Sequence, residues 1–130
     1  FNQFLTLGVG SKPMMVGYES QLLDLAVNQP DAFKQVKDDV VIVYPTPTVW
    51  STHTLMALDE KGGTLLNLLK TPAVQKLAWE CHGFRAANFA GTDSISRFGV
   101  PGTLDQIPAV SELPNNDAMQ QLIATLQSTQ

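Results

Sequence analysis

Two short polar segments of the sequence carry residue types that bind small ligands. The candidate ligand-binding residues are Gly17, Tyr18, Glu19, Ser20, Pro45, Thr46, Thr48 and Trp50. Hydroxyl groups such as those of Tyr18 and Ser20 orient a ligand by hydrogen bonds, and the ring of Trp50 can stack on one. Each segment follows an apolar run with strand character. Because α/β proteins bind ligands at the carboxyl ends of their strands, we expect both segments at one site.

Both segments also have purely structural interpretations. Tyr18, Glu19 and Ser20 would then form only a strand-to-helix turn in which the acidic side chain favours the helix start. A helix N-terminus beside Tyr18 attracts an anion, whereas Glu19 opposes one unless it points away. Thr46 and Thr48 are either hinge hydroxyls that reach a cleft or part of a solvated connector. The sequence leaves these alternatives open.

The elements that must position these residues follow from hydrophobic patterning. Buried strands are expected over residues 14–18 and 40–44, because these runs are rich in apolar and β-branched residues. Another strand is expected within residues 49–58, centred on the apolar run 55–58. Helices are expected over residues 1–7, 19–27, 31–36, 62–70, 72–82 and 117–126. Residues 84–114 show little periodicity and are expected to run over the surface. The alternation predicts an α/β fold with three layers, a mostly parallel sheet covered by helices.

Capping residues, proline and glycine indicate where several of these helices begin or end. Thr71 is placed to cap the helix that Pro72 begins, since proline at the first helical position loses no hydrogen bond. Gly83 can take the left-handed conformation that ends that helix. Asp31 is expected to cap the short helix over residues 31–36.

Composition excludes several classes of function. The 130 residues carry a net charge of −4 with no run of Lys or Arg, which argues against nucleic-acid binding. The single cysteine and two histidines give no zinc pattern, so neither a metal nor another cofactor is expected. They also suggest no catalytic triad, and the chain is therefore not expected to be an enzyme. Its apolar stretches are too short for a membrane span.

The charged fraction is low for a soluble domain. It is 15%, whereas about 25% is typical. This favours a surface that is covered by a second lobe, a missing segment or another subunit. The sequence also begins inside an apparent element at Phe1, so we expect a processed chain or a fragment.

A group of residues near the end of the helix over 72–82 is expected to be structural. Trp79 should pack in the core, and Arg85 should form a structural ion pair. Glu80, Cys81 and His82 are adjacent on a helix and therefore point in different directions, so they do not converge on a metal or form a nucleophile.

Taken in order, several runs resemble the last third of type II periplasmic solute-binding proteins, of which the molybdate and sulfate receptors are the nearest group. The runs are Met15-Val16-Gly17-Tyr18-Glu19-Ser20-Gln21, Val41-Ile42-Val43-Tyr44-Pro45, Leu55-Met56-Ala57-Leu58, and Leu68-Leu69 through Thr71-Pro72-Ala73-Val74-Gln75 to Gly83-Phe84-Arg85. The resemblance implies a two-lobed fold, incomplete in this chain, in which a tyrosine-proline strand crosses the hinge. It covers residues 13–85. The serine-rich loops with which the family grips an oxyanion are absent from this sequence.

The resemblance also implies a domain organisation and a function. Residues 1–44 would end one lobe, 45–52 form the hinge crossover, 53–87 belong to the other lobe, and 88–130 form a C-terminal extension with a terminal helix. The protein would be a periplasmic or extracellular bacterial receptor, membrane-anchored through a missing N-terminus. It would bind an oxyanion or a small organic solute and serve an ABC-type importer or a signalling partner, with the missing part or a second chain completing the fold. The alternative is a sensory or interaction module of a larger cell-surface protein.

Overall fold

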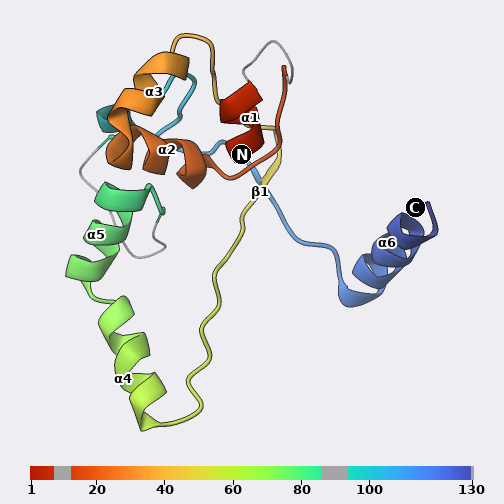
Figure 1. The fold of residues 1–130 in the computed structure, drawn as a ribbon. Coiled ribbons are helices and arrows are strands. Elements are labelled where there is room, and N and C mark those ends of the chain that lie inside the picture. The colour runs from red at the N-terminus through yellow and green to blue at the C-terminus, as the bar shows by residue number, and fades with distance from the viewer. Residues whose placement is uncertain (8–12, 86–93, 130) are drawn as a thin grey trace. The chain divides into compact units, whose positions relative to one another are not determined.

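The computed structural model describes residues 1–7, 13–85 and 94–129. The chain forms two compact units, and each is described by itself: the first unit comprises residues 1–43 and 54–105, and the second comprises residues 44–53 and 106–130. In chain order the described elements are α1 (Asn2–Leu7), α2 (Glu19–Asn28), α3 (Pro30–Val36), β1 (Thr48–Val49), α4 (Glu60–Leu69), α5 (Pro72–His82), the 3₁₀ helix η1 (Ile95–Phe98), β2 (Val110–Ser111) and α6 (Asn116–Ser128) (Figure 1).

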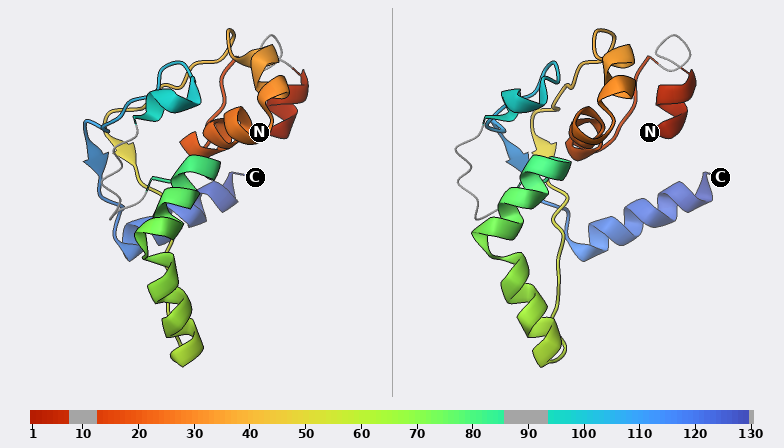
Figure 2. Two further views of the ribbon diagram at one scale, coloured as in Figure 1. Left: turned by 90° about the vertical axis from the view of Figure 1, so that its left-hand side faces the viewer. Right: turned by 60° about the vertical axis from the view of Figure 1, so that its left-hand side comes forward.

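The core of the first unit is built around α2. This helix contacts α3, α5 and η1, and Figure 2 shows α3 and α5 beside it in both views. All four of these helices contribute buried side chains, and Val100, two residues after η1, contributes another. The buried residues are Leu22, Leu23, Leu25, Phe33, Trp79, Ile95, Phe98 and Val100. Burial of a large apolar side chain contributes about 1.5–3 kcal/mol, so this cluster is the main source of stability in the unit.

The start of α2 is specified by three neighbouring residues. The backbone N–H of Tyr18 donates to the side-chain oxygen of Gln21 at 3.0 Å, which satisfies a group at the helix entrance. A Cβ at Gly17 would lie 2.8 Å from that oxygen, so glycine leaves the room that this cap requires. The helix therefore begins at Glu19, as the sequence predicted.

The ends of α5 confirm the local signals in the sequence. Thr71 is the N-cap residue and Pro72 occupies the first turn. Gly83 has a φ of 67° in the left-handed region, and an added Cβ there would overlap the side chain of Leu23. Glycine at this position thus both ends α5 and lets α2 approach closely.

Two other helix starts differ from the sequence prediction. The cap of α3 is Gln29, and Asp31 lies within the first turn, because Pro30 takes the first helical position. In α4 the cap is Asp59, whose Oδ1 accepts from the backbone N–H of Gly62 at 2.6 Å. This places the start of α4 at Glu60, ahead of the two glycines that were expected to open it.

The strands predicted over residues 14–18 and 40–44 are not formed, and neither is the predicted strand centre at 55–58; of residues 49–58, Val49 alone lies in a strand, as the end of β1. All three segments are extended without sheet pairing, and Val16 and Val43 are 97% and 78% exposed. A strand needs a neighbour for its backbone groups, and the described residues form no ladder along the second segment, where Ile42 N–H donates to Pro101 O at 2.9 Å. The described strands are the short parallel pair β1 and β2. The α/β fold class remains a prediction.

The segment expected to run over the surface contributes to the core instead. Ile95, Phe98 and Val100 are buried, although no periodicity marks them. The turn that holds them is anchored by Asp105, which accepts hydrogen bonds from the backbone N–H of Ile95 at 2.7 Å and from the Ser94 hydroxyl at 2.9 Å. These bonds hold the pKa of the Asp105 carboxyl below its usual range, chiefly through the backbone N–H of Ile95.

The second unit pairs β1 with β2 in parallel register, Thr48 opposite Val110. The backbone N–H of Thr48 donates to Ala109 O at 3.0 Å. The terminal helix α6 confirms the helix predicted over residues 117–126, and Asn115 caps it through a 3.0 Å bond from the N–H of Ala118. None of its described side chains is buried, and the exposed apolar ones are Met119, Leu122, Ile123 and Leu126.

Candidate functional site

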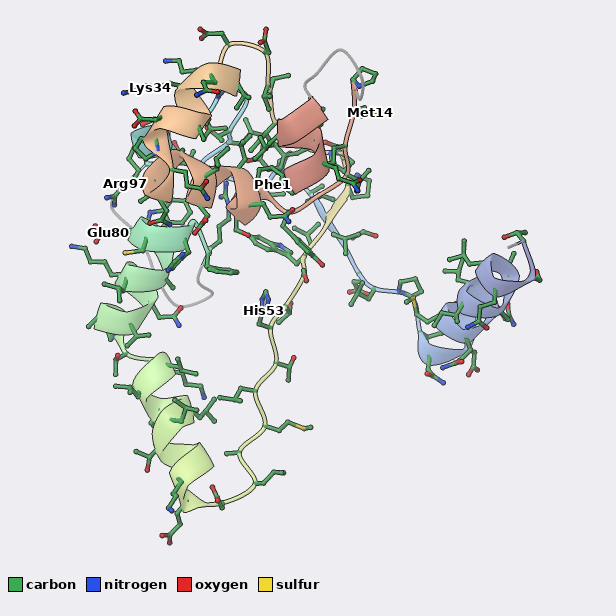
Figure 3. All side chains as sticks on the ribbon, viewed as in Figure 1. Phe1, Met14, Lys34, His53, Glu80 and Arg97 are labelled. Carbon is green, nitrogen blue, oxygen red and sulfur yellow. The ribbon has the colours of Figure 1, made fainter. Side chains whose placement is uncertain are left out.

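A pocket of about 310 Å³ opens in the first unit between α1, α2 and the end of α5. Phe1, which Figure 3 labels, is one of the residues that line it. The described residues that line the pocket are Phe1, Leu5, Ser20, Gln21, Asp24, Leu25, Gln29, His82 and Phe84. Apolar side chains and hydrogen-bonding side chains therefore meet in one concave surface, as they do in small-molecule sites.

The polar side of the pocket is supplied mainly by one face of α2. Ser20 and Asp24 are four positions apart, so their side chains lie one helical turn apart on the same face. Gln21 lies beside them, with its side-chain oxygen engaged by the backbone of Tyr18. Because α2 is anchored in the core by its opposite face, these groups sit on a rigid support.

Asp24 is the most constrained of these polar side chains. Its Oδ1 accepts from Asn28 Nδ2 at 2.8 Å and lies 2.7 Å from His82 Nδ1, which must donate to the carboxylate. Asn28 also donates to the carbonyl oxygen of Cys81 at 2.8 Å. These bonds tie α2 to the end of α5 and fix the carboxylate. Within the described residues, Oδ2 of Asp24 has no hydrogen-bond donor.

Glu19, which was predicted to be a ligand-binding residue, is engaged by an arginine. Arg85 Nε and Nη2 donate to the two Glu19 carboxylate oxygens at 2.7 and 2.9 Å, and both side chains are mostly buried. Arg85 also donates to the carbonyl oxygens of Leu104 and Asp105. The predicted structural ion pair of Arg85 is thus confirmed, and Glu19 serves as its partner at the start of α2.

The other predicted residues of the first segment differ in their relation to the pocket. Ser20 lines the pocket. Tyr18 caps α2 through its backbone, and its side chain is exposed and does not line the pocket. Gly17 provides the space for the Gln21 cap. Of the four residues, Ser20 alone lines the described pocket.

The second predicted segment belongs to the other unit. Pro45 and Thr46 are exposed, Thr48 pairs with β2 through its backbone, and Trp50 is 44% exposed. These residues are assigned to residues 44–53 of the second unit, whereas Ser20 belongs to the first. Their joint participation in one cleft remains a prediction.

The helix α5 confirms two structural expectations. Trp79 is buried and packs edge-on against Phe98, with ring centroids 5.0 Å apart, and the Arg85 guanidinium lies 6.0 Å from its ring. Glu80 and His82 diverge as expected: Glu80 accepts from Arg97 at 2.9 Å, and these two labelled residues lie together in Figure 3. His82 instead reaches Asp24 on α2.

Sequence reasoning missed Asp24, His82 and Gln29 as pocket residues. Asp24 and His82 are 58 positions apart, so no local pattern links them. The available signal was the four-residue spacing of Ser20 and Asp24, which places two polar side chains on one face of a predicted helix.

In the part of the chain that the structure describes, no group of three or more His, Cys, Asp or Glu side chains is placed to hold a metal ion. No described helix has both the length and the apolar content needed to cross a bilayer. Comparison with protein-family models, with curated proteins and with solved structures finds no match to this chain.

Proposed function

We propose that the chain is part of a type II solute-binding receptor and that its ligand occupies the pocket between α1, α2 and α5. The pocket carries this proposal, because its volume of about 310 Å³ falls at the lower end of the range for small-molecule sites. The sequence resemblance adds support, because Ser20, which lies in one of the runs that resemble the family, lines the pocket. In this proposal the receptor is periplasmic or extracellular and delivers its ligand to an ABC-type importer or reports it to a signalling partner.

Binding is favoured over catalysis by the geometry around His82. Ser20, Asp24 and His82 share the pocket, and the pair formed by Asp24 and His82 has the orientation that a general base requires. A serine nucleophile must also hydrogen-bond to its base, and no such bond joins Ser20 to His82 within the described residues. The pair is therefore better suited to holding a polar group than to activating one.

The lining also bears on the choice between an oxyanion and an organic solute. Among the described lining residues there is no Lys or Arg, and the neighbouring Arg85 is committed to Glu19. Asp24 adds a negative charge that repels an anion. A small organic solute is thus favoured over an oxyanion.

Calorimetric and thermal-shift titration of the protein against oxyanions and small organic solutes tests the proposal. A ligand at 100 times its Kd stabilises the native state by about 2.7 kcal/mol, which appears as a rise in Tm. Ser20→Phe should fill the pocket and abolish the rise. Ser128→Phe makes the same change on α6 in the second unit and should leave it intact. A panel without any binder, or binding unaffected by Ser20→Phe, would refute the proposal.

A further inference from the structure

The described lining of the pocket contains an acidic side chain and no Lys or Arg. Asp24 is the one carboxylate among the described lining residues, and none of those residues is Lys or Arg. His82 faces the pocket with its Nδ1 directed at Asp24, 2.7 Å away. The charged neighbours on adjoining elements are Glu19 and Arg85, which neutralise each other in a two-point ion pair. The charged side chains of the pocket therefore offer a ligand a hydrogen-bond acceptor, the Asp24 carboxylate, and no cationic Lys or Arg donor.

The two oxygens of Asp24 have different surroundings. Asn28 and His82 both donate to Oδ1, which fixes the orientation of the carboxylate. Oδ2 receives no hydrogen bond from the described residues and retains its lone pairs for a ligand. An acceptor that is already oriented loses little conformational freedom when a donor binds.

Two further acceptors lie within the same lining. The Ser20 hydroxyl and the side-chain amide of Gln29 form no side-chain hydrogen bond with other described residues. An ammonium group has three donors and no acceptor, so it can use a carboxylate, a hydroxyl and an amide oxygen together. An anion that carries no donor group would leave Oδ2 of Asp24 unpaired, because an ionised carboxylate can only accept.

The remainder of the lining is hydrocarbon. Phe1, Leu5, Leu25 and Phe84 supply aliphatic and aromatic surface. The volume of about 310 Å³ equals that of about ten water molecules, which limits the ligand to about that number of non-hydrogen atoms.

Building on the proposed function, we propose that the pocket binds a small organic cation, a primary amine that carries an aliphatic or aromatic group. The ammonium group donates to Asp24 Oδ2, and the hydrocarbon part packs among Phe1, Leu5 and Leu25. This assigns Asp24 as the residue that determines specificity for charge.

Three probes of nearly equal size separate the contributions of charge and shape. They are 2-phenylethylamine, 2-phenylethanol and phenylacetate, which are cationic, neutral and anionic at pH 7. Isothermal titration calorimetry on the full chain should show binding of the amine, at least tenfold weaker binding of the alcohol and no binding of phenylacetate. Phenylacetate binding as tightly as the amine would overturn the inference.

A variant of Asp24 tests whether its carboxylate is the group that favours the amine. Asp24→Asn keeps the shape of the side chain and the bond to His82, so it should weaken binding of the amine at least tenfold and leave that of the alcohol unchanged. Asp31→Asn removes the same charge from an exposed site on α3 and should change neither. Unaltered amine binding in Asp24→Asn would overturn the inference, and the three-probe series on the unchanged protein decides the matter if that variant does not fold.

The two proposals fail in different ways. If phenylacetate or another anionic solute binds and Ser20→Phe blocks it while 2-phenylethylamine does not bind, the receptor function stands and the assignment of a cationic ligand is wrong. If no probe and no solute of the wider panel binds, both proposals are wrong.

Discussion

The helices α2 and α6 both have a row of apolar residues, but this row is buried in α2 and exposed in α6. Both carry leucines at helical spacing, but α2 buries Leu22, Leu23 and Leu25, whereas α6 exposes its apolar row, with Leu126 at 65%. The difference shows that the periodicity of apolar residues predicts an apolar helix face, whereas the burial of that face depends on which other segments contact it. In the first unit those segments are α3, α5 and η1.

The largest test of this comparison is truncation of one leucine in each helix. Leu23 is 0% exposed, so Leu23→Ala should lower the free energy of unfolding by about 3 kcal/mol through lost burial and a cavity. Leu126→Ala should change it by less than about 0.5 kcal/mol. Urea unfolding followed by circular dichroism measures both. Equal losses would mean that α6 is packed as firmly as α2.

The close approach of α2 and α5 provides the second test. Gly83→Ala should lower the free energy of unfolding by about 2 kcal/mol, because the residue has φ of 67° and its Cβ would overlap Leu23. The control is Gly63→Ala in α4, where an added Cβ meets nothing within 4 Å. That change should raise the free energy by about 0.5–1 kcal/mol, since alanine favours a helix interior. A neutral Gly83→Ala would contradict the packing of these helices.

The third test concerns the ion pair at the start of α2. Glu19→Gln should lower the free energy of unfolding by about 1.5 kcal/mol, because it leaves the mostly buried Arg85 with weaker acceptors. Asp31→Asn breaks an exposed pair with Lys34 and should have an effect below about 0.5 kcal/mol. Thermal unfolding of the two variants compares them directly. An equally small effect of both would show that the pair of Glu19 and Arg85 is solvated.

The helices could be predicted from the sequence because their determinants are local. Thr71, Pro72 and Gly83 specify the two ends of α5 through backbone preferences that need no distant partner. The strands could not be predicted in the same way. The run over residues 40–44 has high β propensity, but a ladder requires a second segment, and among the described residues no strand pairs with this run.

The candidate site could be predicted only in part. Ser20 was identified because it follows an apolar run and opens a helix, and it lines the pocket. Its partners were not identified, because the bond between Asp24 and His82 joins residues 58 positions apart. The burial of Ile95 and Phe98 was missed for a similar reason: their turn is held by Asp105 rather than by a periodic pattern.

The smallest expected effect is the response to acid of the turn that Asp105 holds, which contains Ile95 and Phe98. The pKa of Asp105 is lowered in the folded chain, so its contribution to stability is complete above the ordinary value of about 3.9 and is lost as the pH falls through the lower folded pKa. As the carboxyl is protonated at that lowered pKa, the bonds from Ile95 N–H and the Ser94 hydroxyl should weaken and the packing of Phe98 on Trp79 should loosen. The change should be confined to the first unit.

Tryptophan fluorescence can distinguish the two units in this experiment, because the two tryptophans are Trp79 in the first and Trp50 in the second. In Trp50→Phe, acid titration below pH 4 should shift the emission of Trp79 to longer wavelength, since the indole becomes hydrated. In Trp79→Phe, the emission of the half-exposed Trp50 should change little. Asp105→Asn in the Trp50→Phe background should remove most of the acid response, because an amide keeps an acceptor and does not titrate in this range. An undiminished response would assign the acid sensitivity to groups of the first unit other than Asp105.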